Sequence, residues 1–394
     1  MGFMSRLRYL RDWRRLPARI ATLCEAWLGA PHGPSTIQIE HTKRCNLKCV
    51  MCAHGSAHPP ANEPDMTLDE FKACVDGPHS LGNLTAVHIQ GLGEPFLHRD
   101  FPAMVRHANR LGLQTGTISN MTVMNERIAE EIVSSGLDCL GVSLDSPDPA
   151  SIAVLRRGAS FDVLARMIEN LNLIRHKQAE MKANTPEIIV YAIALKSTLP
   201  KLAQMKALLK ELKIRKLCFE QLWASEISPE FLMPNGTRVI DEPLTTLPPR
   251  ELEQAVAEMN ALTDDEFMVV PSPIFECHSD AGLREDGIFT CLDLWEHPAI
   301  GVNGAVTPCC FTVGGGALNM GNVRQNSFQD IWSGRPFEEL RRAHLLGSAP
   351  EICRNCSHFY QLIRPWRVFK KNRHPHRYDL IHLGCWHGKT RRVR

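Results

Sequence analysis

The chain has 394 residues, which is long enough for two domains that each bury a hydrophobic core. With 44% hydrophobic and 22% charged residues, its composition is that of a soluble globular protein, and no apolar run approaches the roughly 20 residues that a membrane-spanning helix needs. The formal net charge of +2 is unevenly divided, because residues 1–30 carry +4 and residues 364–394 carry +9, which leaves −11 on the residues between them.

The first 34 residues predict a basic amphipathic helix with a bend at Pro17, since apolar side chains recur every three or four residues and arginines occupy another face. We expect this helix and the basic tail either to pack on the acidic body of the protein or to touch an anionic membrane surface weakly. Nucleic acid is not an expected partner, because no nucleic-acid-binding motif accompanies the charge. No apolar signal-peptide segment follows the first arginines, so the 14 cysteines indicate metal binding in a reducing cytoplasm rather than disulfides.

Three cysteines follow the first strand-like run, Thr36–Glu40, with the spacing C-x3-C-x2-C: Cys45, Cys49 and Cys52. Three thiolates in one loop can hold three irons of a [4Fe–4S] cluster and leave the fourth iron open for a cofactor or substrate. A zinc site is the alternative, in which His54 supplies a fourth ligand.

Strand-like and helix-like stretches then alternate as far as residue 225, which predicts βαβ units and a parallel sheet. The expected strands after the first are Leu84–Gln90, Leu113–Ile118, Cys139–Asp145, Ile188–Leu195 and Lys216–Leu222. The expected helices are Leu68–Val75, Phe101–Leu111, Asn125–Ser135, Phe161–Ile174 and Leu199–Leu212.

Polar residues end several of these strands, where parallel sheets bind their ligands. Gly91-Leu92-Gly93-Glu94-Pro95 ends the second, Ser119-Asn120 the third and Ser143-Leu144-Asp145 the fourth. A glycine permits close approach of the backbone to a ligand, and Glu94 can accept hydrogen bonds from an ammonium group. Ordinary turns are the alternative interpretation, because all of these residues are common turn formers. Tyr191, Lys196, Glu220 and Gln221 lie near the same edge, with no role assignable from the sequence.

The composition changes after residue 225. Residues 226–275 are rich in proline and predict a linker that contains one helix, Arg250–Leu262. Strands joined by a hairpin at Asn303-Gly304 are expected over Gly287–Cys310, and one helix over Ser327–Leu346. A second thiol set lies in this region, Cys291, Cys309, Cys353 and Cys356, and suits a closed four-cysteine [4Fe–4S] cluster or a structural zinc. Cys310 follows Cys309, and we expect only Cys309 to ligate because neighbours on a strand face opposite sides.

The spacing Cys45-x3-Cys49-x2-Cys52, with Asn46-Leu47 after the first cysteine, resembles the cluster loop of the radical S-adenosylmethionine (radical SAM) superfamily. The resemblance implies an α/β fold whose core is a (β/α)6 partial TIM barrel, and a core cluster whose open iron binds S-adenosylmethionine. Gly91–Pro95 resembles the motif that binds the methionine amino group in this superfamily. The implied contacts with the cofactor are Gly93, Glu94, Ser119, Asn120, Ser143 and Asp145.

The order Cys291, Gly304-x4-Cys309, Cys353-x2-Cys356 resembles the auxiliary-cluster domain called SPASM, or its shorter twitch form. A full SPASM domain would continue with a cysteine six residues after Cys356, where Leu362 stands, so the resemblance implies a single auxiliary [4Fe–4S] cluster. The expected domains are the N-terminal helix 1–34, the radical SAM core 35–225, the linker 226–275, the auxiliary-cluster domain 276–363 and the basic tail 364–394.

These resemblances imply a radical SAM oxidoreductase that oxidises a small polar or carbohydrate-like molecule, with the auxiliary cluster taking up an electron. An external donor of the flavodoxin or ferredoxin type would reduce the core cluster. Two alternatives stay open. One is maturation of a ribosomal peptide, against which stands the short stretch of about 34 residues before the core, too few for a leader-binding domain. The other is a non-catalytic iron–sulfur electron carrier.

Overall fold

The computed structural model describes residues 32–55, 63–222, 227–272, 275, 289–291, 293–313, 318–354, 356 and 360–361, so the expected N-terminal helix and basic tail lie outside the described residues. Ten strands form one sheet in the order β11-β10-β9-β1-β2-β3-β4-β5-β6-β7, and β8 pairs with β12. The strands are β1 (Thr36–Ile39), β2 (Ala86–Ile89), β3 (Gln114–Ser119), β4 (Cys139–Ser143), β5 (Glu187–Ala194), β6 (Lys216–Gln221), β7 (Met268–Val270), β8 (Phe289–Thr290), β9 (Ala299–Ile300), β10 (Ala305–Thr307), β11 (Gly321–Asn322) and β12 (Tyr360–Gln361).

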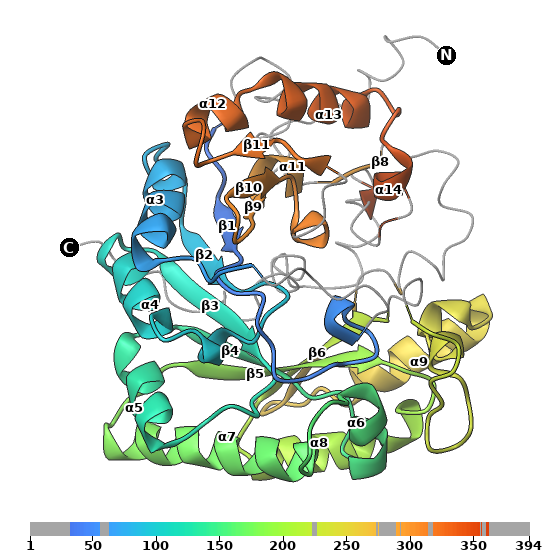
Figure 1. Cartoon of the computed structure of the whole chain (residues 1–394). Helices are drawn as coiled ribbons and strands as arrows, with labels where there is room; N and C mark the ends of the chain where they lie inside the picture. The colour runs from blue at the N-terminus through green and yellow to red at the C-terminus, as the bar shows by residue number, and fades with distance from the viewer. Residues whose placement is uncertain are drawn as a thin grey trace.

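Helices follow the strands of the core and lie along the outside of the curved sheet (Figure 1). The core helices are α3 (Leu68–His79), α4 (Phe101–Arg110), α5 (Glu126–Ser135), α6 (Pro149–Leu155), α7 (Val163–Glu180) and α8 (Leu202–Glu211). Of these, α6 was not anticipated from the sequence. Polar side chains begin several helices: Thr67 and Glu70 form a capping box at α3, and Asn125, Asp148 and Asp162 cap α5, α6 and α7.

The six predicted core strands are confirmed, and each pairs in parallel with the next. Alternate residues of the strands, such as Ile37, Val87 and Val190, join residues of the surrounding helices in one hydrophobic core. The other residues of each strand point to the opposite, concave face, because side chains alternate along a strand. The (β/α)6 partial barrel is therefore present, and the carboxyl ends of its strands share one edge.

The segment predicted as a linker contributes to the barrel. It contains α9 (Pro249–Ala261) and also β7, which pairs in parallel with β6 through Lys216 and Met268. The sequence did not reveal this seventh strand, because three residues are too few to show an alternating pattern.

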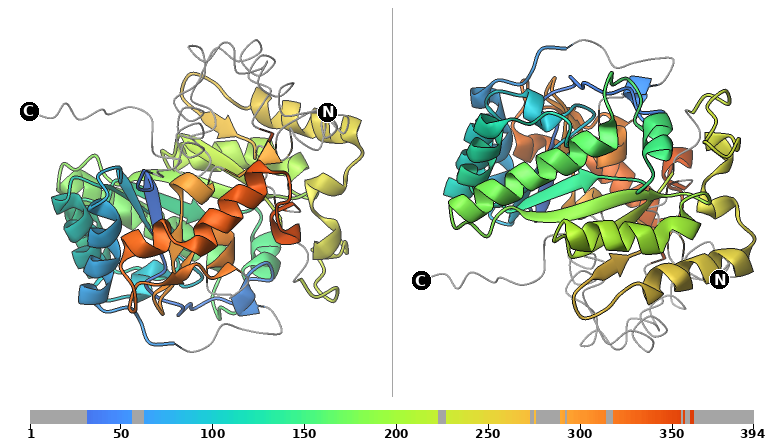
Figure 2. Two further views of the ribbon diagram at one scale, coloured as in Figure 1. Left: turned by 90° about the horizontal axis from the view of Figure 1, so that it is seen from above. Right: turned by 90° about the horizontal axis from the view of Figure 1, so that it is seen from below.

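The C-terminal region extends the sheet of the core. Strand β9 pairs in parallel with β1, and β10 and β11 continue from β9 in antiparallel order after the expected turn at Asn303-Gly304. Seen from above, α12 and α13 lie across this part of the molecule (Figure 2). The helices here are α11 (Asp293–Glu296), α12 (Phe328–Trp332), α13 (Arg335–Leu345) and α14 (Glu351–Arg354). The boundary expected at residue 276 therefore does not separate two sheets.

The single helix expected over Ser327–Leu346 is two helices. Gly334 has an extended backbone and is the N-cap residue before α13, which has Pro336 in its first turn. Proline is tolerated there but not inside a helix, because it lacks an N–H group and clashes with the preceding turn. Within the described part of the chain, no helix is long and apolar enough to cross a membrane.

Candidate active site

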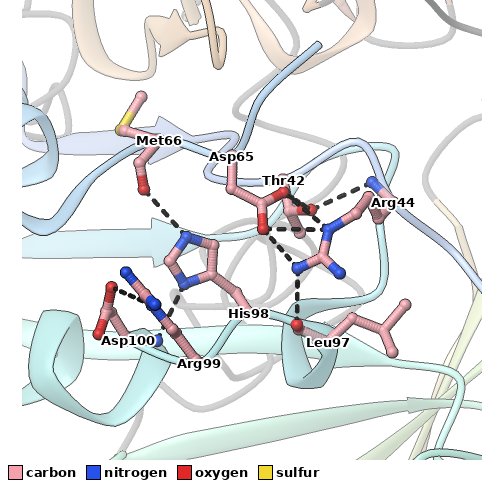
Figure 3. Close-up of polar contacts among 8 residues, drawn as sticks. All are labelled: Thr42, Arg44, Asp65, Met66, Leu97, His98, Arg99 and Asp100. Carbon is pink, nitrogen blue, oxygen red and sulfur yellow. Dashed lines mark hydrogen bonds and ion pairs between the residues drawn. The ribbon is translucent and has the colours of Figure 1, made fainter. Parts of the chain in front are cut away.

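The loop that carries the three core cysteines is held at its start by an ion pair and a buried histidine (Figure 3). The carboxylate of Asp65 accepts hydrogen bonds from Thr42 Oγ1 at 2.7 Å and from the Arg44 guanidinium, which also donates to the Leu97 carbonyl at 2.8 Å. His98 accepts at Nδ1 from the N–H of Asp100 at 3.1 Å, so its Nε2 carries the hydrogen. That nitrogen lies 2.9 Å from the carbonyl oxygen of Met66, to which it donates.

The middle of the cysteine loop lies against the end of α6. The N–H groups of Lys48 and Val50 donate to the carbonyls of Arg157 and Leu155 at 2.7 and 3.0 Å. Gly158 has a φ of +98°, and a Cβ there would lie 2.9 Å from the Lys48 nitrogen. Backbone contacts therefore hold the middle of the loop against the segment that ends α6.

The thiols of Cys45, Cys49 and Cys52 lie close together. Burial raises the pKa of Cys45 to about 11 and that of Cys49 to about 12; Cys52 adds to the rise at both thiols, and Cys45 adds to that at Cys49. In a [4Fe–4S] cluster each thiolate binds a different iron, so the thiols need to surround a cluster rather than converge on a point. Among the described residues, no three Cys, His, Asp or Glu side chains stand around a single-metal position. The donor set fits the predicted cluster.

Glu94 is the centre of a hydrogen-bonded group beside these thiols. Its carboxylate accepts from Ser119 Oγ at 2.8 Å, from the Asn120 N–H at 2.8 Å and from the Phe96 N–H at 3.2 Å. Burial raises the pKa of Glu94 to about 7, although these hydrogen bonds oppose the rise. A carboxylate has about four acceptor positions, so one is left for a further donor such as an ammonium group.

Asn120 connects this group to the cysteine loop. Its Nδ2 donates to Asn46 Oδ1 at 3.0 Å and lies 3.8 Å from Cys45 Sγ. Its Oδ1 accepts from the hydroxyl of Thr122 at 2.7 Å, and Asn46 donates to the same hydroxyl at 2.7 Å. The predicted residues Glu94, Ser119 and Asn120 therefore lie together next to Cys45.

Asp145 lies on the other side of the loop and is occupied by partners within the protein. It is fully buried and accepts from Arg156 Nε at 2.8 Å and from the Ile193 N–H at 3.0 Å. Arg156 in turn points an N–H at Cys49 Sγ, 3.9 Å away. The hydroxyl of Ser143 makes no hydrogen bond with any described residue and is half-buried at the end of β4. The predicted contacts of Ser143 and Asp145 with the cofactor stay predictions.

Position 93 requires a glycine for a steric reason that the sequence did not suggest. A Cβ at this position would lie 2.4 Å from the Thr42 carbonyl oxygen and 2.8 Å from that of Arg44. The N–H of Glu94 also donates to the Arg44 carbonyl at 2.8 Å. The absent side chain therefore permits close approach of the cysteine loop, whether or not a ligand also lies there.

The concave face of the sheet carries half-buried polar side chains. Gln90 donates to Gln38 across β2 and β1 at 3.3 Å, and the ring of Tyr191 packs over Gly141 of the neighbouring strand. His88, Ser143 and Glu220 belong to the same alternating set. An apolar cluster of Cys139, Ile189, Cys218 and Val270 lies on the same face, so the face is only partly polar.

The second thiol set is also brought together by the fold. In addition to the larger effect of burial, Cys309 and Cys356 raise the pKa of Cys291, and Cys356 also raises the pKa of Cys309 and of Cys353. Burial raises the pKa of Cys309 to about 12 and that of Cys353 to about 11. Four thiols drawn from a strand end, a hairpin and a later turn fit the predicted auxiliary cluster.

Cys309 and Cys310 do not lie side by side on a strand, contrary to the expectation from the sequence. Strand β10 ends at Thr307, and Cys310 begins a 3-10 turn, η7 (Cys310–Thr312), so the two residues are not strand neighbours. Cys310 also lies near Cys309 and Cys356, which add to the effect of burial in raising its pKa. Strand alternation therefore cannot assign the ligand, and the choice of Cys309 stays a prediction.

Sequence reasoning missed Arg156 and Thr122, and it gave Glu220 no role. Arg156 follows a short helix that has no strong apolar period, and Thr122 is an ordinary polar residue after a strand. Neither position carries a spacing motif, so nothing in the sequence singled them out.

Family models match the two regions of the chain that contain the thiol sets. Residues 39–183 match the family model of the radical SAM superfamily, and residues 291–357 match that of an iron–sulfur cluster-binding domain, SPASM. The two matches include all seven predicted cluster cysteines.

Relatives match most of the chain at low identity. A tungsten-containing aldehyde ferredoxin oxidoreductase cofactor-modifying protein of Pyrococcus furiosus is 24% identical over 317 residues, which are 77% of this chain and 82% of that protein. A PqqA peptide cyclase of Rhizobium meliloti is 26% identical over 336 residues, 82% of this chain and 79% of the relative. The structure of Streptococcus suis SuiB bound to S-adenosylmethionine is similar in fold, with a TM-score of 0.61 at 15% identity over 86% of this chain and 74% of SuiB.

Proposed function

Since the chain belongs to the radical SAM superfamily and has a C-terminal iron–sulfur cluster-binding domain, we propose that it is an oxidoreductase that removes two hydrogens from a small polar or carbohydrate-like molecule. The chain is an enzyme rather than a non-catalytic iron–sulfur carrier, and its cofactors are a core [4Fe–4S] cluster, an auxiliary [4Fe–4S] cluster and S-adenosylmethionine. The identity of the substrate and the oxidative outcome belong to the proposal.

The cofactors supply a 5′-deoxyadenosyl radical for hydrogen abstraction and an electron acceptor, the auxiliary cluster. The side chains of the protein hold these cofactors in place. Cys45, Cys49 and Cys52 hold the core cluster, and Glu94 offers its remaining acceptor position to the amino group of S-adenosylmethionine. Ser119 and Asn120 keep that carboxylate in place. The auxiliary cluster is held by a separate set of thiols, Cys291, Cys309, Cys353 and Cys356.

One observation supports the oxidative assignment: the chain has a second set of thiols, predicted to hold a cluster with four protein ligands, in addition to the three-thiol set. A cluster with four protein thiolates has no free iron for a substrate, so its chemical use is electron transfer. Polar side chains at the strand ends of the concave face, such as Gln38, Gln90 and Ser143, support a substrate with several hydroxyl groups, because each buried hydroxyl needs a hydrogen-bonding partner. An external donor of the flavodoxin or ferredoxin type would then be needed to reduce the core cluster.

Anaerobic reconstitution tests the proposal. We expect about eight irons per chain, four for each cluster, and 5′-deoxyadenosine when reductant and S-adenosylmethionine are added. Replacing Cys45, Cys49 or Cys52 with Ala should abolish 5′-deoxyadenosine formation, because the core cluster loses one of its three protein ligands. Replacing Cys353 or Cys356 should lower the iron content by about four and leave S-adenosylmethionine cleavage in place.

A matched control is Cys74→Ala, a buried cysteine on α3 that belongs to neither thiol set and should keep both clusters. An iron content near four in the wild-type protein would contradict the assignment of two independent clusters. Loss of 5′-deoxyadenosine formation in the Cys353→Ala variant would also contradict it.

The similarity to a PqqA peptide cyclase supports a second candidate, modification of a peptide by the same radical chemistry. The two candidates differ in product. A small molecule that has lost two hydrogens supports the first, and a crosslinked, epimerised or oxidised peptide supports the second.

A further inference from the structure

Arg156 is held next to Cys49, the middle thiol of the core cysteine loop, by contacts of the backbone. The residues before and after Cys49 donate their N–H groups to the carbonyls of the residues after and before Arg156, at 2.7 and 3.0 Å. The N–H of Arg156 itself donates to the Ile152 carbonyl at 2.8 Å, where α6 ends. The end of this helix and the cysteine loop therefore fix the two residues relative to each other.

The Arg156 side chain lies between a carboxylate and a predicted cluster ligand. It is nine-tenths buried, its Nε donates to Asp145 Oδ2 at 2.8 Å, and its Nη1 points an N–H at Cys49 Sγ, 3.9 Å away. Asp145 is fully buried, and its other oxygen accepts from the Ile193 N–H of β5 at 3.0 Å. The sheet thus holds the carboxylate, the carboxylate orients the guanidinium, and the guanidinium reaches the sulfur.

The pairing with Asp145 explains how a cation can stand at this buried position. A buried charge without a partner is strongly destabilising, whereas a hydrogen-bonded pair is tolerated. A guanidinium has five N–H donors in a rigid fork, so one edge can bind the carboxylate while another donor stays directed at the thiol. A lysine has a single ammonium group on a flexible stem and could not keep this arrangement.

The contact at Cys49 differs in charge from the contact at Cys45. The amide Nδ2 of Asn120 lies 3.8 Å from Cys45 Sγ, so that sulfur meets a neutral donor. At Cys49 the donor is a cation. A hydrogen bond from an ionised donor is about twice as strong as a neutral one, and it favours negative charge on the acceptor.

We propose that Arg156 is a positioning residue that acts through Cys49 to make the core cluster easier to reduce. The inference rests on the core cluster of the proposed function and needs no assumption about the substrate. The external donor gives one electron, no bond forms or breaks, and the added negative charge is shared by the cysteine sulfurs. An N–H donor and a positive charge at one of these sulfurs stabilise the reduced state more than the oxidised state, which raises the reduction potential.

A redox titration of the reconstituted full-length protein tests the proposal without a substrate. The protein is titrated with a strong reductant and mediators in the absence of S-adenosylmethionine, and the electron paramagnetic resonance signal of the reduced core cluster is followed. That signal is identified in a separate sample as the one that changes when S-adenosylmethionine is added, because the cofactor binds the open iron of the core cluster.

In Arg156→Gln the ratio of reduced to oxidised core cluster at a fixed potential should fall at least tenfold, which is a midpoint potential lower by about 59 mV or more for one electron. Arg157→Gln is the matched control. The neighbouring Arg157 side chain is exposed and its guanidinium lies 4.7 Å from the centre of the Phe231 ring, so this variant should keep the wild-type potential.

A second variant covers the case in which Arg156→Gln loses the core cluster because Asp145 is left as an unpaired buried charge. Asp145→Asn/Arg156→Gln removes both charges together. Burial raises the pKa of Cys49 to about 12, Arg156 lowers it, and the opposing effect of Asp145 is smaller than that of Arg156. The potential should therefore fall in the double variant too, by less than in the single one.

Three results would overturn the assignment: a wild-type potential in whichever of the two variants keeps the cluster, an equal fall in Arg157→Gln, or loss of the core cluster from both variants. The last would mean that Arg156 supports the folded loop and not its potential.

Failure of this inference is distinguishable from failure of the proposed function. A protein that binds both clusters and forms 5′-deoxyadenosine, but has the same core potential with and without Arg156, keeps the function and loses the residue. A wild-type protein without a core cluster loses both.

Discussion

Cys309 and Cys310 are adjacent thiols at the auxiliary site, and their backbone conformations differ. Cys309 is extended, with a φ of −160°, whereas Cys310 opens the turn η7. The sulfur of Cys309 lies 3.8 Å from the Thr312 hydroxyl, a contact that would steady a thiolate ligand. Hydrogen bonds to cluster sulfurs are a usual means of holding and tuning such ligands.

We therefore predict that Cys309→Ala lowers the iron content by about four and that Cys310→Ala leaves it unchanged. The two variants control for each other, since they remove the same group from neighbouring positions. Iron and sulfide analysis after reconstitution measures the difference. The reverse result, a silent Cys309→Ala and iron loss in Cys310→Ala, would assign the ligand to Cys310.

The protonation state of Glu94 also matters at the core site. Burial raises the pKa of Glu94 to about 7, although three hydrogen bonds oppose the rise. The carboxyl group therefore titrates near neutral pH, and a bound cation can change its protonation state. An ammonium group placed against it would favour the ionised form.

At the scale of elements, the cysteine loop is positioned by the turn that follows β2. The closest approach is at Gly93, where an added Cβ would meet two backbone carbonyls of the loop. Backbone atoms cannot rotate away as a flexible side chain can, so the loop itself would have to move.

We predict that Gly93→Ala destabilises the protein by about 1–3 kcal/mol, the usual cost of overpacking, and lowers the occupancy of the core cluster. Gly116→Ala on β3 is the control, because its Cβ would have no heavy atom nearer than 3.9 Å. Thermal unfolding and the iron content of both variants test the prediction. Equal iron contents in the two variants would mean that the turn does not position the loop.

At the scale of the whole molecule, the C-terminal region and the core share one sheet. The N–H of Glu40 donates to the Ile300 carbonyl at 2.9 Å where β1 meets β9. The buried Glu40 side chain accepts from the Leu92 N–H at 3.1 Å and from the Val302 N–H at 3.4 Å, and burial raises its pKa. One residue thus joins the turn after β2 to the hairpin of the C-terminal region.

We predict that Glu40→Ala lowers the free energy of unfolding by roughly 1–3 kcal/mol for each N–H left without a partner. The loss should affect one shared transition, measured by circular dichroism and by the visible absorbance of the clusters. Glu266→Ala, whose side chain is 81% exposed, should change stability by no more than about 0.5 kcal/mol. Two separate transitions in the wild-type protein would show that the regions unfold independently.

The sequence by itself determined the order of strands and helices in the core, because each strand is a short apolar run and each helix repeats its apolar residues at a helical spacing. It also predicted the two sets of thiols, since the spacing within each set is a local property of the chain, and the choice of Cys309 over Cys310 stays a prediction. Short elements could not be predicted from the sequence. Strand β7, helix α6 and the break between α12 and α13 involve too few residues to form a pattern, and packing against the barrel decides them.

Only the tertiary structure decided which polar groups act together. Glu94, Ser119 and Asn120 lie on different strand ends, and their hydrogen bonds follow from the register of β2 and β3. Such contacts join residues that are distant in the chain. No local spacing encodes them, because burial and charge act through space.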